Sequence, residues 1–152
     1  MILLRGFALG LAAAWASVAS AQACTGRPSA VRLFVNVTNV RSSEGLIAVT
    51  LYPDERSRFL ARRGSLYVGR VPARQGTTRV CIHLPNTGIW ALGVYHDADG
   101  NRSFNRGRFG LPAEGYGFSN NAPAVVGLPA FRRVRLAVPR TGMSTSVRLR
   151  YP

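Results

Sequence analysis

The stretch from Val94 to Asn121, VYHDADGNRSFNRGRFGLPAEGYGFSNN, carries the residue types that could do chemistry. It holds half of the chain's 6 acidic residues. After His96, oxygen side chains recur at every second position: Asp97, Asp99, Asn101, Ser103 and Asn105. Alternating oxygens in a tight loop are typical of calcium ligands, because Ca²⁺ takes six to eight of them. The pattern suggests Ca²⁺ as the one cofactor, held by Asp97, Asp99 and Asn101, with Glu114 completing the shell if the loop folds back.

The calcium pattern is incomplete. Arg102 stands where the helix-flanked calcium loop has glycine, and Arg108 stands where it has a bidentate glutamate. Asp and Asn beside glycine also make turns without any metal. In that alternative, Asp97 or Asp99 pairs with Arg102 or Arg106. A metal site and a purely structural turn both stay open.

The second half of the loop, Glu114 to Phe118, alternates glycines with aromatic residues. Glycine permits unusual backbone dihedrals, so Tyr116 and Phe118 could fold this half onto a sheet. The block can therefore be a scaffold or a surface that binds a ligand. The candidate loop-site residues are His96, Asp97, Asp99, Asn101, Glu114, Tyr116, Asn120 and Asn121.

Catalysis has weak support in these residues. His96, Asp97 and Glu114 are a base and two acids, but nothing in their spacing places them across a cleft. Ser119 lacks the G-x-S-x-G elbow of a hydrolase nucleophile. The chain has only 2 histidines, which disfavours a multi-histidine zinc site. We expect no enzymatic activity.

The rest of the chain reads as short strands in which apolar and polar residues alternate. This two-residue period is typical of half-buried strands. A helix is expected over 55–63, after Asp54 as N-cap and before Gly64. The pattern predicts an all-β fold: a seven-stranded antiparallel Ig-like or transthyretin-like β-sandwich with one short helix and one long loop. The expected strands are 31–40, 46–52, 65–71, 77–84, 89–96, 131–138 and 145–151.

Arginine supplies every basic side chain, giving a formal net charge of +14. The two last expected strands should pair, with Arg133, Arg135, Arg148 and Arg150 on their outward faces as a basic patch. Such charge attracts polyanions: lipopolysaccharide, anionic phospholipid or acidic glycan. Another envelope protein is a further candidate partner. The alternative is that these arginines only solvate the strand faces.

Residues 1–23 resemble a secretory signal, with an early Arg5, a short apolar run and an A-x-A cleavage site. We expect a single domain over 24–152, without a transmembrane segment, in the periplasm or secreted. Export disfavours nucleic acid as a partner. Cys24 and Cys81 are the only cysteines, and in an oxidising space they should form a disulfide. Lipid attachment at Cys24 is the alternative.

Two resemblances follow from these residues. LPNTGIWALGVYHDADGN, residues 84–101, resembles transthyretin-like and carboxypeptidase-regulatory-like sandwich domains. More specifically, the chain resembles the bacterial exported family called domain of unknown function 2141. The likeness lies in the turn from Val40 to Gly45, in Tyr95 to Asp97, and in the block from Gly110 to Asn121. It implies a small periplasmic or surface β-sandwich and implies no activity.

Overall fold

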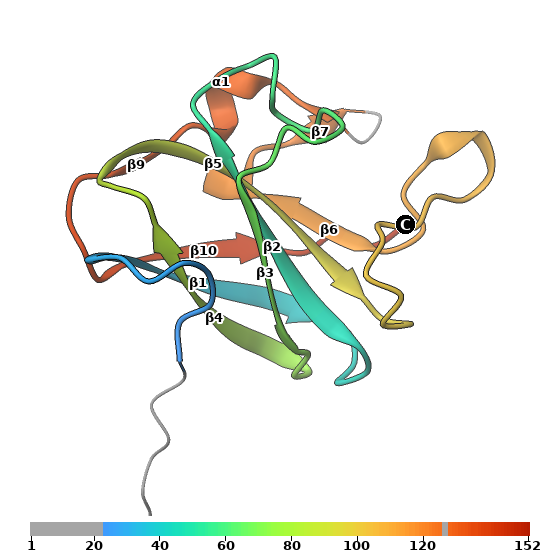
Figure 1. Cartoon of the computed structure of the whole chain (residues 1–152). Coiled ribbons are helices and arrows are strands. Elements are labelled where there is room, and N and C mark those ends of the chain that lie inside the picture. The colour runs from blue at the N-terminus through green and yellow to red at the C-terminus, as the bar shows by residue number, and fades with distance from the viewer. Residues whose placement is uncertain (1–22, 126–127) are drawn as a thin grey trace, which may run out of the picture.

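The computed structural model describes residues 23–125 and 128–152 (Figure 1). The predicted signal segment lies outside the described residues, except for its last residue. The chain is all-β, with two sheets packed as a sandwich. In chain order, the elements are β1 (Val31–Val40), β2 (Leu46–Pro53), β3 (Tyr67–Pro72), β4 (Gly76–Leu84), β5 (Gly88–Asp97), the 3₁₀ turn η1 (Arg108–Gly110), β6 (Gly115–Phe118), the 3₁₀ turn η2 (Ser119–Asn121), β7 (Ala124–Val125), β8 (Leu128–Pro129), α1 (Phe131–Val134), β9 (Leu136–Val138) and β10 (Met143–Arg148).

The first sheet has the strand order β10-β1-β4, and the second has the order β3-β2-β5-β6, with β9 also paired to β5 (Figure 1). β7 and β8 form a small separate pair. β5 is a central strand, as both of its apolar faces predicted, because β2, β6 and β9 all bond to it. The pairs are antiparallel except for β1 and β10, which run parallel. The expectation of a purely antiparallel sandwich was wrong at that one pair.

The core lies between the two sheets and follows the predicted alternation. Leu33, Val35 and Val37 of β1 are fully buried, and the residues between them are more exposed. They face the inward side chains of the second sheet, including Ile47 and Leu92, in one continuous cluster. Fully burying such a side chain contributes about 1.5–3 kcal/mol. The two-residue period therefore sets which face of each strand is buried.

The helix expected over 55–63 is absent there. The segment makes a chain of turns, in which Leu60 and Arg63 adopt left-handed φ values of 57° and 59°. A short isolated helix is only marginal in water, so local turn bonds prevail. The short α-helix of the described residues is α1, inside a segment expected to be a strand. Asn120 stabilises this turn by donating its side-chain amide to the carbonyls of Arg133 and Arg135, at 3.1 and 2.8 Å.

The pairing expected between 131–138 and 145–151 was also wrong. β9 joins β5 in the second sheet, whereas β10 joins β1 in the first. The connection between them crosses the sandwich, and Thr141 Oγ1 donates to the carbonyl of Ala30 at 2.7 Å. Both strands show the same alternation, which identifies a buried face but not a partner strand. The four arginines of the predicted patch therefore do not line one strand pair.

The predicted disulfide between Cys24 and Cys81 is confirmed, with the two Cα atoms 4.4 Å apart. The lead segment lies along the outer edge of β4. Thr25 donates its backbone N–H to the Cys81 carbonyl at 2.9 Å and accepts one from His83 at 3.0 Å. Because the Cys24 sulfur is bonded to Cys81, it is not free for lipid attachment. None of the helices in the described ranges has the length and apolarity to cross a membrane.

Candidate metal centre

The pairing of β5 with β6 brings together acidic residues that are distant in sequence. Asp97 ends β5, and Glu114 immediately precedes β6. His96 is the register partner of Gly115, so Asp97 and Glu114 lie side by side where the two strands begin to separate. Asp99 follows in a tight turn, in which the N–H of Gly100 donates to the Asp97 carbonyl at 3.3 Å. The loop folds back as the calcium interpretation requires.

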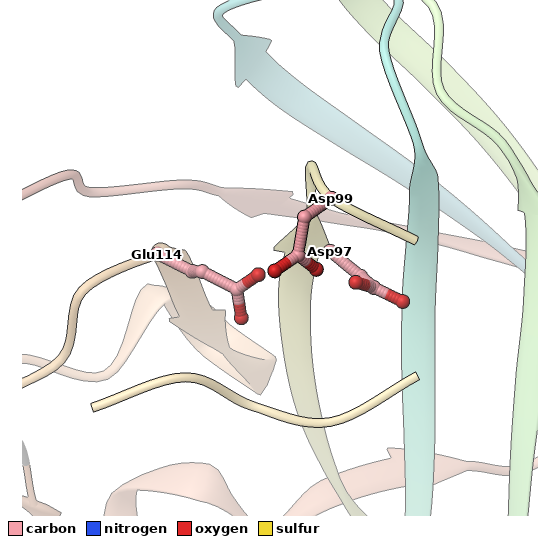
Figure 2. A group of neighbouring side chains, drawn as sticks. All are labelled: Asp97, Asp99 and Glu114. Carbon is pink, nitrogen blue, oxygen red and sulfur yellow. The ribbon is translucent and has the colours of Figure 1, made fainter. Parts of the chain in front are cut away.

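Three carboxylates converge at this point, those of Asp97, Asp99 and Glu114 (Figure 2). One oxygen from each lies within 4.8 Å of the other two. Asp97 is completely buried and Glu114 is 8% exposed, whereas Asp99 lies at the surface. Like charges at such distances repel one another. A cation among the three carboxylates would offset this repulsion.

Both buried carboxylates accept hydrogen bonds from the backbone of the loop. Asp97 Oδ2 accepts the backbone N–H of Arg102 at 2.8 Å, and Glu114 Oε2 accepts that of Asn105 at 2.9 Å. Asp97 Oδ1 is buried and has no hydrogen-bond partner in the described structure. An unpaired buried carboxylate oxygen is costly, because it has lost water and gained nothing in return. A cation within the cluster would satisfy it.

Asp99 is held by the amides of its own loop. Its oxygens accept the backbone N–H of Asn101 at 3.1 Å and the side-chain amides of Asn101 and Asn105, both at 2.9 Å. Asn101 thus turns its nitrogen toward Asp99, and its oxygen accepts the N–H of Ser103 at 2.7 Å. Asn101 orients Asp99 rather than offering the cluster a fourth oxygen, so its role as a metal ligand stays a prediction.

The arginines of the loop do not neutralise the cluster. In the described part of the chain, the ion pairs are Arg58 with Glu55 and Arg135 with Asp54. The Arg106 guanidinium instead donates to the Gly110 carbonyl at 2.8 Å and lies over the ring of Phe104. Among the described residues, neither Asp97 nor Asp99 forms an ion pair with Arg102 or Arg106, and Arg102 contacts Asp97 through its backbone N–H.

The pKa values follow from these surroundings. Burial raises the pKa of Glu114, and the charges of Asp97 and Asp99 raise it further. The pKa of Asp99 is lowered, chiefly by the backbone N–H of Asn101 and then by the amide of Asn105. A cation beside Glu114 would therefore favour the ionised form of this carboxyl.

His96 is buried beside the cluster but faces away from it. Its Nδ1 lies 2.8 Å from the hydroxyl of Tyr151, and its Nε2 lies 2.8 Å from the carbonyl of Glu44. Both ring nitrogens are therefore occupied, so the residue joins the β1–β2 turn to β5. The same turn approaches so closely that a Cβ on Gly45 would lie 2.0 Å from the Asp97 carbonyl oxygen.

The other candidates of the second half of the loop lie elsewhere. Tyr116 sits in β6, and its ring contacts those of Phe104 and Phe118 at 6.2 and 5.9 Å. Asn120 holds α1, and Asn121 accepts the backbone N–H of Arg148 at 2.7 Å. Both asparagines adopt left-handed φ values, 58° and 50°. Asn121 thus connects the end of β6 to β10 of the first sheet, and neither asparagine is brought to the carboxylates.

A hollow bordered by the same loop as the candidate metal centre was not predicted from the sequence. It lies on the outer face of the second sheet, between the turns at 55–64 and the loop at 98–114, and has a volume of about 250 Å³. The outward alternation of Thr50 with Tyr52 and of Gly93 with Tyr95 was the available signal. Its lining is Thr50, Tyr52, Leu60, Gly93, Val94, Tyr95, Phe104, Arg106, Tyr116 and Phe118.

Comparison with known proteins finds a family match. Residues 35–146 match a family model described as "Uncharacterized protein conserved in bacteria (DUF2141)". No curated protein matches the chain. No solved structure matches it either, so the likeness to transthyretin-like domains stays a prediction.

Proposed function

We propose that this chain, which belongs to the DUF2141 family of bacterial proteins, is an exported, non-enzymatic binding module whose 97–114 loop is locked by one Ca²⁺ ion. The ligands from side chains are Asp97, Asp99 and Glu114. The ion neutralises their mutual repulsion and holds the loop against the ends of β5 and β6. The loop then serves as a preformed binding surface on a rigid sandwich.

One observation carries this proposal: the buried Asp97 oxygen without a partner, within a group of three converging carboxylates. Three oxygens spread evenly around one Ca²⁺ at about 2.4 Å lie about 4.2 Å apart. One oxygen of each carboxylate already lies within 4.8 Å of the other two. A small inward shift of the side chains would therefore let all three share one ion.

The donor set favours calcium over other metals. All three donors are carboxylate oxygens, the preferred ligands of hard cations. Zinc prefers imidazole and thiolate, and here His96 and both cysteines are engaged in other bonds. Mg²⁺ keeps several waters and is usually bound by one or two carboxylates. A cluster of three, two of them buried, suits the larger and more easily dehydrated ion.

Export and the absence of catalysis are supported by separate features. The disulfide between Cys24 and Cys81 suits an oxidising compartment. Two of the side chains that could do acid–base or nucleophilic chemistry, His96 and Ser119, are held by structural bonds. His96 is bonded through both nitrogens, and Ser119 Oγ binds the N–H of Leu92 and the carbonyl of Val134.

The test is thermal unfolding of residues 24–152 in EDTA and in Ca²⁺. A ligand that binds only the folded state at 100 times its Kd stabilises it by about 2.7 kcal/mol, which for a domain of this size raises Tm by on the order of 10 °C. Mg²⁺ at equal concentration should raise Tm less.

Asp97→Asn keeps the acceptor for Arg102 but removes the charge. It should abolish the response to Ca²⁺ and melt no lower than wild type in EDTA, because it relieves repulsion. Asp54→Asn is the matched control, since Asp54 pairs with Arg135 outside the cluster, and it should retain the full calcium response. Absence of a Tm shift at millimolar Ca²⁺, or an undiminished shift in Asp97→Asn, would overturn the proposal.

A further inference from the structure

The hollow bordered by the same loop as the candidate metal centre has the dimensions of a small binding pocket. Its volume of about 250 Å³ is below the range of roughly 300–1,000 Å³ typical for drug-sized ligands. It therefore suits one ring rather than an extended chain. The buried Gly93 of β5 lies in the lining without a side chain, and Leu60 and Arg106 contribute from the segments on either side.

An aromatic wall surrounds this pocket, formed by Tyr52, Tyr95, Phe104, Tyr116 and Phe118. Phe104 contacts Tyr95 and Tyr116, with ring centroids 5.4 and 6.2 Å apart and planes tilted by 65° and 71°. Such edge-to-face contacts fix each ring against the next. The C–H face of a sugar ring carries partial positive charge and is attracted to the negative face of an aromatic ring.

The pocket also offers hydroxyl groups that have no hydrogen-bond partner in the part of the chain that the structure describes. Thr50, Tyr52 and Tyr116 line it, and among the described residues none of their hydroxyls has a hydrogen-bond partner. The fourth hydroxyl, of Tyr95, is engaged with the Arg102 carbonyl at 3.4 Å. A hydroxyl both donates and accepts. Aromatic walls with several such hydroxyls match a ligand that has an apolar face and a polar edge.

The charge at the pocket decides between ligand classes. Arg106 is the charged side chain of the lining, and it is held in place by the Gly110 carbonyl and the Phe104 ring. Aromatic cages can also bind quaternary ammonium groups, but a guanidinium at the rim repels a cation. It binds a carboxylate well, because its planar fork of N–H donors matches the two oxygens.

From these features we infer that the pocket binds a single acidic sugar ring, such as a uronic acid of an envelope glycan. The carboxylate of the sugar lies against Arg106, and its ring lies against the aromatic wall. The formal net charge of +14 favours the approach of such a polyanionic chain. The aromatic wall and the hydroxyl groups would contact the sugar ring, and Arg106 would bind its carboxylate.

The pocket is connected to the metal centre through Asn105. Its backbone N–H donates to Glu114 and its side chain donates to Asp99, and its neighbours in the chain are Phe104 and Arg106. A cation that fixes the two carboxylates also fixes both pocket residues. Only this cation dependence rests on the proposed function; the pocket itself stands on its lining.

The experiment is titration of the mature chain with galacturonic acid and with galactose, followed by calorimetry and amide chemical shifts, in EDTA and in excess Ca²⁺. We expect saturable binding of galacturonic acid, at least tenfold tighter than that of galactose, and tighter in Ca²⁺ than in EDTA. If galacturonic acid binds equally well in Ca²⁺ and in EDTA, the sugar-binding pocket is supported and its coupling to the metal is refuted. A Tm shift by Ca²⁺ without any galacturonic acid binding would refute the pocket alone.

Two variants assign the binding to this pocket. Arg106→Gln should weaken the binding of galacturonic acid at least tenfold and leave the affinity for galactose unchanged. Gly93→Val should block both sugars by filling the floor. The matched control is Arg108→Gln, which makes the same charge change two residues away, where the guanidinium lies over Phe109 and not in the pocket. Equal losses in Arg106→Gln and Arg108→Gln, equal affinity for the two sugars, or preferential binding of choline would each overturn the inference.

Discussion

The backbone N–H of Asn105 donates a hydrogen bond to Glu114 Oε2 at 2.9 Å, across nine residues of loop. This bond closes the loop on the side of β6, as the bond from Arg102 to Asp97 closes it on the side of β5. It brings Phe104 against Tyr95 and Tyr116. The loop therefore binds the carboxylates through its backbone N–H groups and lines the pocket through the side chain of Phe104.

Glu114 should make the calcium-free protein less stable as pH rises. Its pKa is raised above the ordinary 4.5, so the folded state binds this proton more tightly than the unfolded state. The resulting stabilisation is fully present below pH 4.5 and is lost as pH rises through the raised value. Glu114→Gln, which stays neutral, should melt increasingly above wild type in EDTA as pH is raised from 4 to 7.

In Ca²⁺ at pH 7 the order of the melting temperatures should reverse. Glu114→Gln should then melt below wild type, because it lacks one of the three carboxylate ligands. Glu55→Gln is the control, because Glu55 is exposed and forms only a weak surface ion pair with Arg58, at 3.8 Å. The difference in melting temperature between Glu55→Gln and wild type should not change with pH. Melting curves at each pH measure both. A difference between Glu114→Gln and wild type that shrinks as pH rises in EDTA would contradict the pKa direction.

Gly45→Ala should damage both the turn and the metal centre. Gly45 has φ +65°, and an added Cβ would lie 2.0 Å from the Asp97 carbonyl oxygen. A left-handed φ alone costs a non-glycine residue roughly 1–2 kcal/mol, and the clash adds to it. Gly142→Ala shares the left-handed φ, at +75°, with nothing within 4 Å. Denaturant unfolding should show a larger loss for Gly45→Ala, and calcium affinity should fall in that variant alone. Equal losses of stability would mean that the close contact has no cost.

The disulfide should stabilise the domain by about 4 kcal/mol, the value that chain entropy assigns to a closed loop of this length. The sequence separation of the cysteines is 57 residues. The Cys24→Ser/Cys81→Ser double variant should unfold at correspondingly lower denaturant. Wild type should show no titratable thiol without reductant. Two free thiols in the folded, exported protein would contradict the bridge.

Attachment to anionic envelope lipids through arginine stays a prediction. The four arginines do not lie on one pair of neighbouring strands, because β9 and β10 belong to different sheets. Arg135 forms a bidentate pair with Asp54 at 2.7 Å, so its charge is locally offset. Arg133, Arg148 and Arg150 are exposed. Replacing these three by Gln should weaken binding to anionic liposomes, and wild-type binding should fall as salt rises.

The control for net charge is the triple Gln variant of Arg56, Arg62 and Arg74, which are also exposed. If both triple variants lose the same affinity, binding follows total charge and no patch exists. If neither variant binds less than wild type, arginine attachment is wrong.

Much of the fold was predictable because strand burial is a local property. Alternation along β1 identified Leu33, Val35 and Val37 as buried, since successive side chains of a strand point to opposite faces. The two cysteines, together with the expectation of export, predicted their bond. The partner strands of β9 and β10 were not predictable, because identical alternation serves either sheet. The helix expected over 55–63 failed because its signals at Asp54 and Gly64 suit turns equally well.

The candidate site divides in the same way. The sequence alone determined that Asp97, Asp99 and Glu114 lie in one oxygen-rich loop, and it left a Ca²⁺ site and a purely structural turn both open. Only the tertiary structure decided that the three converge without an arginine among them and that one buried oxygen of Asp97 is unpaired. Asp97 and Glu114 meet because β5 and β6 pair in one register and the β1–β2 turn covers the end of β5. That register depends on packing between distant segments, which residue spacing along the loop does not encode.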